Sequence, residues 1–362
     1  MVNVSILGMV GDFEKNPQGS GARRMISEIY NHIKNTGTSS IQLERVELKN
    51  PIPGSRSMPI FPSNLFNRYK NVDILHNIRS NLLCAPFVSK KTILLNTAYE
   101  ITAMTHPEFV IEEFLELKMR IGAKAYLKLH KLAEKEILTA DYLISISSST
   151  TKDLISLGYN KDHIYTIPLG VDYRFCHKKD FKKHNVFNVG YLGSLIKKKN
   201  LLFAINAFKL IEDPKMQMHI YGKKMNTVFY SKIKNSASSD KRIYLCGFAP
   251  EEEIIKIYDS FDVLLYPVLR GGFELGILEA QARGVPVIIY EDSEIPEEVR
   301  KYCFKAKDEG EMANIIEKIK QKGYDTKLRE NAMSYARSFT WEKTAAATFK
   351  TYLDIARREG IN

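Results

Sequence analysis

Two carboxylates, Glu274 and Glu279, interrupt an apolar stretch in the second half of the chain, LRGGFELGILEAQARGVPVIIYED, residues 269–292. A carboxylate among aliphatic side chains is costly unless something donates hydrogen bonds to it, and a ribose diol is such a donor. Gly271 and Gly272 precede them, and glycine lets a backbone approach a ligand closely. We therefore predict that both carboxylates face a ligand. The alternative is that Glu274 stabilises a helix N-terminus and Glu279 is exposed.

Two further stretches place small residues between a predicted strand and a predicted helix, where backbone amides can bind an anion. They contain Gly19, Ser20 and Gly21 in NPQGSGARR, and Gly193 and Ser194 in GYLGSLIKKKN. The second stretch also carries a lysine run, residues 197–199, from which an ammonium group can reach a phosphate. We assign this contact to Lys199, which lies closest to the following apolar helix. Simple turn geometry and a solvated lysine run are the alternatives.

The elements that must position these residues alternate along the chain as short aliphatic runs and longer amphipathic stretches, which is typical of parallel sheets flanked by helices. Strands are predicted at residues 2–10, 72–78, 90–97, 141–147, 187–194, 217–222, 242–248, 262–268 and 285–292. Helices are predicted at residues 22–34, 107–138, 201–211, 250–261 and 276–284. The fold class is therefore α/β, with ligands expected at the carboxyl ends of the strands.

The length of 362 residues exceeds what one hydrophobic core normally organises, so two domains are expected. Residues 170–186 have no hydrophobic period and carry clustered lysines and histidines, which favours a linker. We predict an N-terminal α/β domain at 1–178 and a C-terminal α/β domain at 185–340. A final helix at 341–362 is expected to pack back on the first domain.

The composition, 44% hydrophobic and 26% charged residues, is that of a folded soluble protein. The net charge of +11 attracts anions: nucleic acid, lipid head groups or phosphorylated small molecules. Nucleic acid is the weakest of these, because the basic residues are dispersed and no binding module is present. The four cysteines form no C-x-x-C pair, which argues against disulfides and a zinc site. The start of the chain lacks a secretory signal, which indicates a cytoplasmic protein.

The stretch GGFELGILEAQARGVPVI resembles the E-G-F-G-L-x-x-L-E-A-M-A-x-G-x-P-V-I signature of retaining glycosyltransferases of family four. Similar stretches follow in order: ADYLISISSSTTKDLISLGYNKDHIYTIPLGVD, HIYGKK, LCGFAPEEEIIKIYDSFDVLLYP and FTWEK. The resemblance covers nearly the whole chain and is weaker across residues 40–130. It implies the GT-B fold, in which two Rossmann-like domains face a central cleft, and hexosyltransferase-type activity. Residues 1–178 would then be the N-terminal Rossmann-like acceptor domain, and residues 185–340 the C-terminal Rossmann-like nucleotide-sugar domain.

The resemblance also implies roles for individual residues. Gly19 to Gly21 would approach the donor diphosphate, Lys199 would neutralise it, and Glu279 would bind the ribose hydroxyls. The base would rest near Gly222 and the turn at residues 246–248. The implied catalytic residues are Glu274 and Asn96, and the implied donor-binding residues are Gly19, Ser20, Gly21, Ser194, Lys199, Gly222, Phe248, Arg270, Gly272, Phe273, Leu275, Leu278 and Glu279. No metal and no cofactor are expected, and the donor is a UDP-, GDP- or ADP-sugar.

Three positions depart from the family pattern. Gly271 stands where the first glutamate of the E-x7-E pair is expected, Ser194 where an arginine is expected, and Asn96 where a histidine is expected. Glu274 can replace the lost carboxylate from three residues downstream. The missing positive charge can come from Arg270, Lys197 or Lys198. Asn96 can hydrogen-bond a sugar hydroxyl but cannot titrate. The remaining histidine candidates are His76 and His106, with an ordinary structural role as the alternative.

The expected activity is transfer of a sugar from a nucleotide diphosphate sugar to a hydroxyl group of a glycan or lipid-linked acceptor, with retention. The alternatives are a weak or inactive relative that binds a nucleotide or glycan, and a sugar-nucleotide epimerase on the same fold. The basic residues of the helical segment 117–138 suit either a solvated helix or docking to an anionic membrane. The second option places the protein peripherally at the inner face of the membrane.

Overall fold

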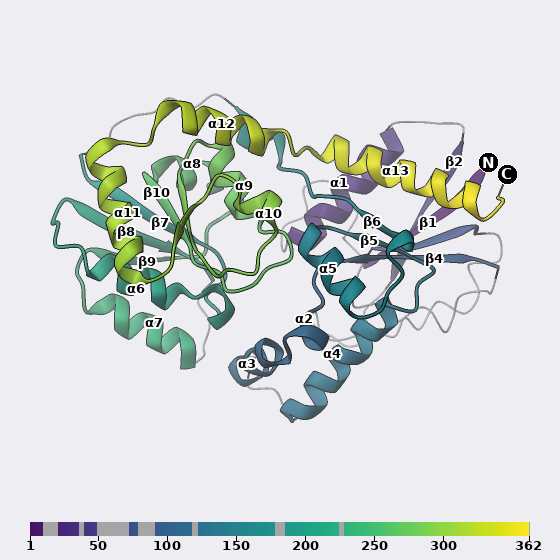
Figure 1. Ribbon diagram of the computed structural model, residues 1–362, viewed down its shortest axis with the longest axis horizontal. Coiled ribbons are helices and arrows are strands. Elements are labelled where there is room, and N and C mark those ends of the chain that lie inside the picture. Colours follow the sequence, from purple (N-terminus) through teal and green to yellow (C-terminus); the bar gives the residue numbers. More distant parts are fainter. Residues whose placement is uncertain are drawn as a thin grey trace. The chain divides into compact units, whose positions relative to one another are not determined.

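A computed structural model describes most of the chain, and it divides the chain into two compact units, each described here by itself (Figure 1). The described residues are 1–9, 21–35, 40–48, 72–78, 91–117, 122–177, 185–223 and 228–361. Unit 1 spans Met1–Phe114, Met119–Gly170 and Trp341–Asn362, and unit 2 spans Leu115–Lys118 and Val171–Thr340.

The division falls at Gly170, eight residues before the predicted end of the first domain. Residues 171–177 belong to unit 2 because they are hydrogen-bonded to it. The Val171 N–H donates to the Phe339 carbonyl at 2.9 Å, and the Arg283 guanidinium donates to the His177 carbonyl at 2.7 Å. The start of the predicted linker is therefore anchored to the second unit.

The sheet of unit 1 is parallel, and its described strands are in the order β2-β1-β3-β4-β5-β6. The strands are β1 (Val2–Met9), β2 (Ile41–Leu48), β3 (Ile74–Asn77), β4 (Ile93–Ala98), β5 (Tyr142–Ser145) and β6 (Ile164–Thr166). The sequence analysis missed β2 and β6. Both are edge strands, and an edge strand lacks the continuous apolar run of a buried one.

Helices cover this sheet, and one prediction about them is wrong. The helices are α1 (Gly21–Asn35), α2 (Thr102–Thr105), α3 (Pro107–Leu117), α4 (Ala123–Ile137), α5 (Ser148–Ser156) and α13 (Trp341–Arg358), with a 3-10 turn, η3, at Lys161–His163. The predicted single helix at 107–138 is two helices, because Gly122 is extended, with ψ of 152°, and caps α4. The C-terminal helix α13 packs on α1, within unit 1.

The sheet of unit 2 is also parallel, with its described strands in the order β12-β11-β10-β7-β8-β9. The strands are β7 (Phe187–Leu192), β8 (Met216–Tyr221), β9 (Ile243–Gly247), β10 (Val263–Tyr266), β11 (Val287–Tyr290) and β12 (Phe304–Ala306). From β7 the chain runs outward through β8 and β9 on one side. From β10, the neighbour of β7, it runs outward through β11 and β12 on the other side. The order therefore reverses between β7 and β10, and ligands of open α/β sheets bind at the carboxyl ends of the strands at such a point.

Helices and short turns fill both faces of this second sheet. They are η4 (Tyr173–Cys176), η5 (Lys197–Lys199), α6 (Leu201–Lys209), α7 (Val228–Ser238), α8 (Ile254–Ser260), α9 (Leu275–Ala282), α10 (Glu297–Arg300), α11 (Glu309–Lys322) and α12 (Thr326–Arg337). One core joins Val189 and Leu265 of the sheet to Phe208 of α6 and Ile316 of α11, all of them fully buried. Burial of this apolar face is what stabilises the unit.

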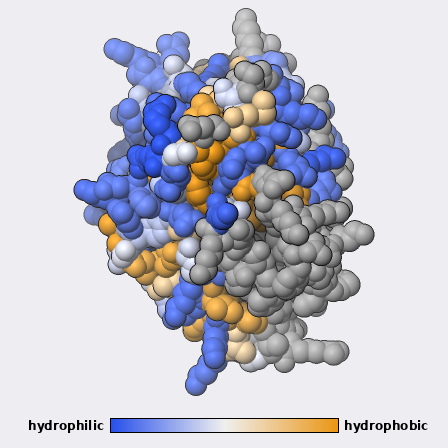
Figure 2. All heavy atoms as spheres, turned by 90° about the vertical axis from the view of Figure 1, so that its right-hand side faces the viewer, coloured by the Kyte–Doolittle hydropathy of each residue, from blue (hydrophilic) through white to orange (hydrophobic). Residues whose placement is uncertain are grey.

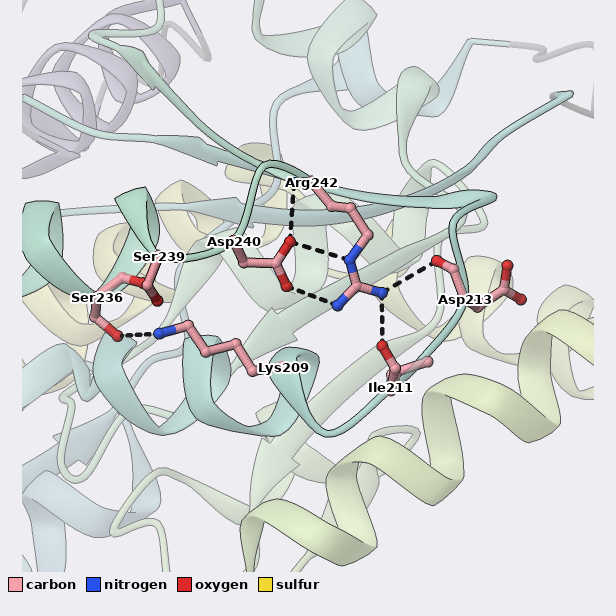
Figure 3. Close-up of polar contacts among 7 residues, drawn as sticks. All are labelled: Lys209, Ile211, Asp213, Ser236, Ser239, Asp240 and Arg242. Atoms are coloured by element: carbon pink, nitrogen blue, oxygen red, sulfur yellow. Dashed lines mark hydrogen bonds and ion pairs between the residues drawn. The ribbon is translucent and has the colours of Figure 1, made fainter.

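An ion-pair cluster closes the opposite, amino-terminal end of β8 and β9 (Figure 3). The Arg242 guanidinium donates to both Asp240 carboxylate oxygens, and to the carbonyls of Ile211 at 2.6 Å and Asp213 at 3.1 Å. It also lies 4.8 Å from the centroid of the Phe208 ring. The hydrogen bonds that the Asp240 carboxylate accepts from the Arg242 side chain are the main cause that lowers the pKa of Asp240. This cluster joins the loops that precede the two strands.

The described surface of unit 1 is mixed in character. On the face shown in Figure 2, hydrophilic side chains cover most of the described area and hydrophobic ones gather in separate groups between them. Such scattered apolar groups are ordinary on a protein surface. Among the described helices, none combines the length and the hydropathy needed to cross a bilayer.

Candidate functional site

Lys199 and Glu274 meet beyond the carboxyl ends of β7 and β10, where the strand order of unit 2 reverses. Lys199 ends η5, which follows β7, and Glu274 is the residue before α9, which follows β10. The two connecting segments are joined by a hydrogen bond from the Leu269 N–H to the Lys198 carbonyl at 2.9 Å. The Lys199 Nζ lies 2.6 Å from Oε2 of Glu274. The structure thus brings together two of the residues that the sequence analysis singled out.

The Glu274 carboxylate is buried and charged. Its side chain is 10% exposed, and Oε2 also accepts the Tyr266 hydroxyl at 2.6 Å. Burial acts to raise the pKa of Glu274, but the charge of Lys199 and the hydrogen bonds from Lys199 and Tyr266 outweigh it, so the pKa lies below its usual value. A buried charge is tolerated only with such partners. Glu274 is therefore ionised at neutral pH.

The carboxylate of Glu274 occupies the space beside Gly271. A Cβ on Gly271 would lie 1.8 Å from Oε1 of Glu274 and 2.5 Å from its Cδ, closer than atoms can approach. Any side chain at position 271 would therefore displace the carboxylate. The Glu274 carboxylate thus lies directly beside position 271.

Glu279 lies further along α9 and has a tyrosine of its own. The Tyr258 hydroxyl donates to Oε2 of Glu279 at 3.2 Å and is 3.3 Å from the Gly276 carbonyl. A Cβ on Gly276 would lie 3.3 Å from the Tyr258 hydroxyl and 3.2 Å from the Tyr266 ring. The first turn of α9 thus rests on two tyrosines, each of which holds one carboxylate.

The two tyrosines were missed by the sequence analysis. Tyr266 stands in the apolar run of β10 and Tyr258 in the amphipathic pattern of α8, so both counted as ordinary core positions. The available signal was chemical: a buried tyrosine hydroxyl needs a hydrogen-bond partner, and two carboxylates follow in the same stretch.

The region predicted to hold a nucleotide base lies at the ends of β8 and β9. Phe248 follows β9 and is 71% exposed, which leaves its ring accessible for stacking. The Gly222 N–H donates to the Gly247 carbonyl at 2.7 Å, and a Cβ on Gly222 would lie 2.4 Å from the Gly193 carbonyl oxygen. Gly222 is therefore required by the close approach of the segments that follow β7 and β8.

Several residues of unit 2 that were predicted to bind the donor make contacts within the protein. Leu278 is fully buried in the core and cannot reach a ligand. The Leu275 N–H donates to the Phe273 carbonyl at 2.9 Å, so it is not available to a phosphate. The Phe273 ring packs on Phe339 inside the unit, with ring centroids 6.1 Å apart. These contacts could not be predicted, because a motif position does not tell which way a side chain or amide points.

The remaining predicted residues of this unit lie around the pair. Arg270 is buried and forms an ion pair with Glu294, so it is engaged within the protein. Ser194 is exposed, and its carbonyl accepts the Tyr191 hydroxyl at 2.9 Å. Gly272 is partly buried in the turn before α9. Lys197 is exposed and Lys198 partly buried on η5.

Asn96 of unit 1, which the family resemblance assigns to catalysis, is enclosed in the structure. Asn96 is in the middle of β4 with 0% exposure, and its Nδ2 donates to the Ile137 carbonyl at 3.4 Å. A side chain in this position cannot contact a sugar. Of the glycine-loop residues, Gly19 and Ser20 lie outside the described residues, and Gly21 is the first residue of α1.

The two histidine candidates of unit 1 differ in environment. His76 is fully buried, and its ring nitrogens contact the Tyr352 hydroxyl at 2.7 Å and the Thr97 hydroxyl at 2.8 Å. Burial lowers the pKa of His76 to about 3, so the ring is neutral and ties α13 to the sheet. His106 lies at the surface, 3.1 Å from Glu108. The structural alternative therefore holds for His76.

Among the described residues, no group of three or more histidine, cysteine or acidic side chains is placed to hold a metal ion. On α4, Lys124, Lys128 and Lys135 are exposed, together with Leu132, which is 47% exposed. This solvent face is the basic, partly apolar surface that the sequence analysis noted.

Comparison with known proteins agrees with this geometry. A family described as "Glycosyl transferases group 1" matches residues 186–322, which contain Lys199, Glu274 and Glu279. The chain is 24% identical over 277 residues to O-antigen chain mannosyltransferase B of Escherichia coli, with 71% of this chain and 69% of that protein aligned. It is also 24% identical over 324 residues to the capsular polysaccharide biosynthesis glycosyltransferase CapM of Staphylococcus aureus, with 83% and 82% aligned.

Among solved structures, the chain resembles Anabaena HepE in complex with UDP and glucose, with a TM-score of 0.70 and 15% identity over 98% of this chain and 100% of that one. At this identity the similarity establishes the fold, and the GT-B fold class predicted from the sequence is confirmed. Two parallel, doubly wound sheets, a family match over residues 186–322 and glycosyltransferase relatives along most of the chain together confirm the resemblance to the group 1 glycosyl transferases.

Proposed function

We propose that this glycosyltransferase moves a sugar from a nucleotide diphosphate sugar to a hydroxyl group of a glycan or lipid-linked acceptor, with retention and without a metal ion. The observation that carries the proposal is the contact between Lys199 and Glu274 at the strand-order reversal of unit 2. It places a cation and a carboxylate where open α/β sheets bind ligands.

The chemistry of the reaction gives Lys199 its role. As the glycosidic bond breaks, the electron pair stays with the leaving diphosphate, which gains negative charge. The Lys199 side chain is 16% exposed, so water screens its charge less than it would on an open surface. A fixed cation at this place stabilises the leaving group in the transition state, and a metal ion is then not required. Retention follows from the family resemblance alone.

The carboxylates and Phe248 suit the rest of the donor. Glu279 has one oxygen held by Tyr258, and a ribose diol would donate to the carboxylate as well. The exposed Phe248 ring suits stacking by a base. HepE, which shares this fold, was solved with UDP and glucose, and this supports a nucleotide sugar as the donor. We assign Glu274 to accept a hydrogen bond from a sugar hydroxyl.

The acceptor proposal rests on the relatives and on α4. The relatives are named for O-antigen chains and capsular polysaccharide, which supports a glycan acceptor. The exposed lysines of α4 and the exposed Leu132 suit contact with an anionic membrane surface, where a lipid-linked acceptor would be presented. We place the enzyme in the cytoplasm, peripherally at the inner face of the membrane.

The proposal is tested in two steps. A thermal-shift screen with UDP-glucose, GDP-mannose and ADP-glucose should raise the Tm for one of the three, because a ligand that binds only the folded protein stabilises it. Release of free nucleoside diphosphate is then measured with octyl glycosides as acceptors. An isomerised donor without an acceptor would indicate an epimerase instead.

A second candidate is a relative that binds a nucleotide sugar without transferring the sugar. It is favoured by the burial of Asn96, because the position expected to carry a histidine then offers no group that contacts substrate. The same assay separates the two: a binder shows the thermal shift but releases no nucleoside diphosphate with any acceptor.

A further inference from the structure

We propose that Tyr266 is a positioning residue of the donor site: its buried hydroxyl holds the Glu274 carboxylate between Lys199 and Gly271, so that position 274 supplies the carboxylate that position 271 lacks. This inference rests on the proposed function and adds a residue to the same site. No motif in the sequence indicated it, because a tyrosine in an apolar strand looks like a core residue.

Three contacts define where the Glu274 carboxylate lies. Its Oε2 accepts the Tyr266 hydroxyl at 2.6 Å and the Lys199 ammonium group at 2.6 Å. Its Oε1 lies 1.8 Å from the point where a Cβ on Gly271 would be. Two donors on one oxygen and the backbone of a glycine beside the other fix both the position and the rotation of the carboxylate.

Tyr266 is placed to contact both members of the ion pair. It is the last residue of β10, so its backbone belongs to the sheet. Its ring is buried, and the Lys199 Nζ lies 5.5 Å from the ring centroid. Burial raises the pKa of Tyr266 well above its usual value, so the hydroxyl keeps its proton and remains a donor. The tyrosine therefore restrains Glu274 directly and Lys199 through Glu274.

This restraint matters because a lysine is a flexible point charge on a long stem. A carboxylate in a fixed position limits the ammonium group to one place before the donor binds. A cation that is already in place needs no reorganisation when charge develops on the leaving diphosphate. Loss of the Tyr266 hydroxyl should therefore slow the chemical step more than it weakens donor binding.

The chain offers a matched comparison in Tyr258. Both tyrosine side chains lie against the same residue, Gly276, and each donates to one carboxylate. Tyr258 holds Glu279, which we assign to the ribose, a part of the donor that does not react. Removal of the Tyr258 hydroxyl should therefore weaken donor binding more than it slows the chemical step.

The first test compares three Tyr→Phe variants in the assay for nucleoside diphosphate release. Tyr266→Phe should lower kcat by about 10- to 100-fold while the donor KM changes by less than about 3-fold. Tyr258→Phe should show the opposite split. Tyr352→Phe removes a buried hydroxyl that contacts His76 in unit 1, and it should change neither constant although it lowers Tm. Equal effects of Tyr266→Phe and Tyr352→Phe on both constants would overturn the proposal.

The second test displaces the carboxylate from the other side. Gly271→Ala places a methyl group on Oε1 of Glu274 and should lower kcat by a factor similar to that of Tyr266→Phe. In a Glu274→Ala background the alanine at 271 has no carboxylate to displace, so the two changes should not be additive. Additive losses would show that Gly271 acts independently of Glu274 and would contradict the proposed arrangement.

A third measurement needs no turnover and so separates this inference from the proposed function. Tyr266→Phe should lower Tm by about 4 °C in the parent protein and by less than half of that in a Glu274→Ala background, because the partner of the hydroxyl is then absent. Equal lowering in both backgrounds would refute the hydrogen bond as the basis of the role. A protein that releases no nucleoside diphosphate yet shows this coupling would contradict the proposed function alone.

Discussion

The two ends of the unit 2 sheet carry ion pairs of different kinds. At the amino end, Arg242 and Asp240 are two residues apart, and the guanidinium also donates to two backbone carbonyls (Figure 3). At the carboxyl end, Lys199 and Glu274 are 75 residues apart and come from the segments after two different strands. The first pair joins neighbouring loops. The second exists only because the fold reverses its strand order between β7 and β10.

The cations of the two ion pairs also differ in their chemistry. A guanidinium is a planar fork that suits a fixed, bidentate structural contact, whereas an ammonium group is a mobile point charge that suits a phosphate. Tyr266 then supplies the fixed geometry that the lysine lacks. The comparison teaches that an ion pair built for binding is recognised by which segments it joins and by what holds its carboxylate, more than by its length.

The largest expected effect is at Lys199. Lys199→Gln keeps a hydrogen-bond donor near Glu274 but removes the charge that faces the leaving diphosphate. We expect the rate of nucleoside diphosphate release to fall by about 100- to 1000-fold, as for other lost electrostatic contacts to a transition state. Lys209→Gln is the matched control, because Lys209, at the end of α6, contacts Ser236 beside the Arg242 cluster (Figure 3). A rate within a factor of a few of the parent protein would remove Lys199 from the mechanism.

Arg242 should show the reverse behaviour. Arg242→Ala leaves the Asp240 carboxylate without its partner and removes four hydrogen bonds from the loops before β8 and β9. We expect the free energy of unfolding in urea to fall by about 2 kcal/mol, because hydrogen bonds to charged groups are the stronger ones. Nucleotide binding at temperatures where the variant is folded should stay as in the parent protein. Weakened binding there would mean that the two ends of the sheet are coupled.

A third buried carboxylate, Glu134, sharpens the comparison, because the groups that donate hydrogen bonds to it are backbone N–H groups and not a cation. Glu134 of α4 accepts the N–H groups of Ala103 and Met104, both at 2.7 Å, and thereby caps α2. Burial raises the pKa of Glu134 to about 7, although these hydrogen bonds act to lower it. Glu274 is also buried, but Lys199 holds its pKa below the usual value.

The sign of the pH dependence follows from this raised pKa. A carboxyl whose pKa is higher in the folded state than in the unfolded state contributes stability that is fully present below its usual pKa of 4.5 and is lost as the pH rises through about 7. The free energy of unfolding, measured in urea between pH 5 and 8, should therefore fall with rising pH by about 1 kcal/mol per pH unit. Glu134→Gln should remove this slope. An unchanged slope in the variant would assign it to other groups.

Much of the architecture could be predicted from the sequence. All nine predicted strands lie on observed strands, because buried parallel strands are continuous aliphatic runs. Among the strands that the structure describes, those missed are β2 and β6, at the edges of the first sheet, and β12, at one edge of the second. The long helix at 107–138 was wrong because a hydrophobic period continues across Gly122 although the backbone does not.

The site was predictable only in part. Residue types and spacing singled out Lys199 and Glu274, which the structure brings together. They could not show that Leu278, one residue before Glu279, points into the core, or that Asn96 is enclosed within β4 and its neighbours. Nor could they show Tyr266, because the hydroxyl of a strand residue acquires meaning only from the carboxylate that folding places beside it.

The smallest expected effect, and the one that tests the binding character of the Lys199–Glu274 pair most directly, is at Glu274. In the absence of donor, the Glu274 carboxylate neutralises Lys199, so a diphosphate must share the ammonium group with it. Glu274→Gln removes this competing charge, so UDP alone should bind about 5-fold more tightly, which corresponds to about 1 kcal/mol. Sugar transfer should nevertheless become slower, because a neutral amide replaces the carboxylate that we assign to the sugar. Calorimetry with UDP and the nucleoside diphosphate assay measure the two effects separately.

Glu294→Gln is the control, since Glu294 is paired with Arg270 beside the site. Weaker UDP binding by Glu274→Gln would mean that the carboxylate orients Lys199 for the phosphate more than it competes with it, and the pair would then resemble the structural one at the other end of the sheet.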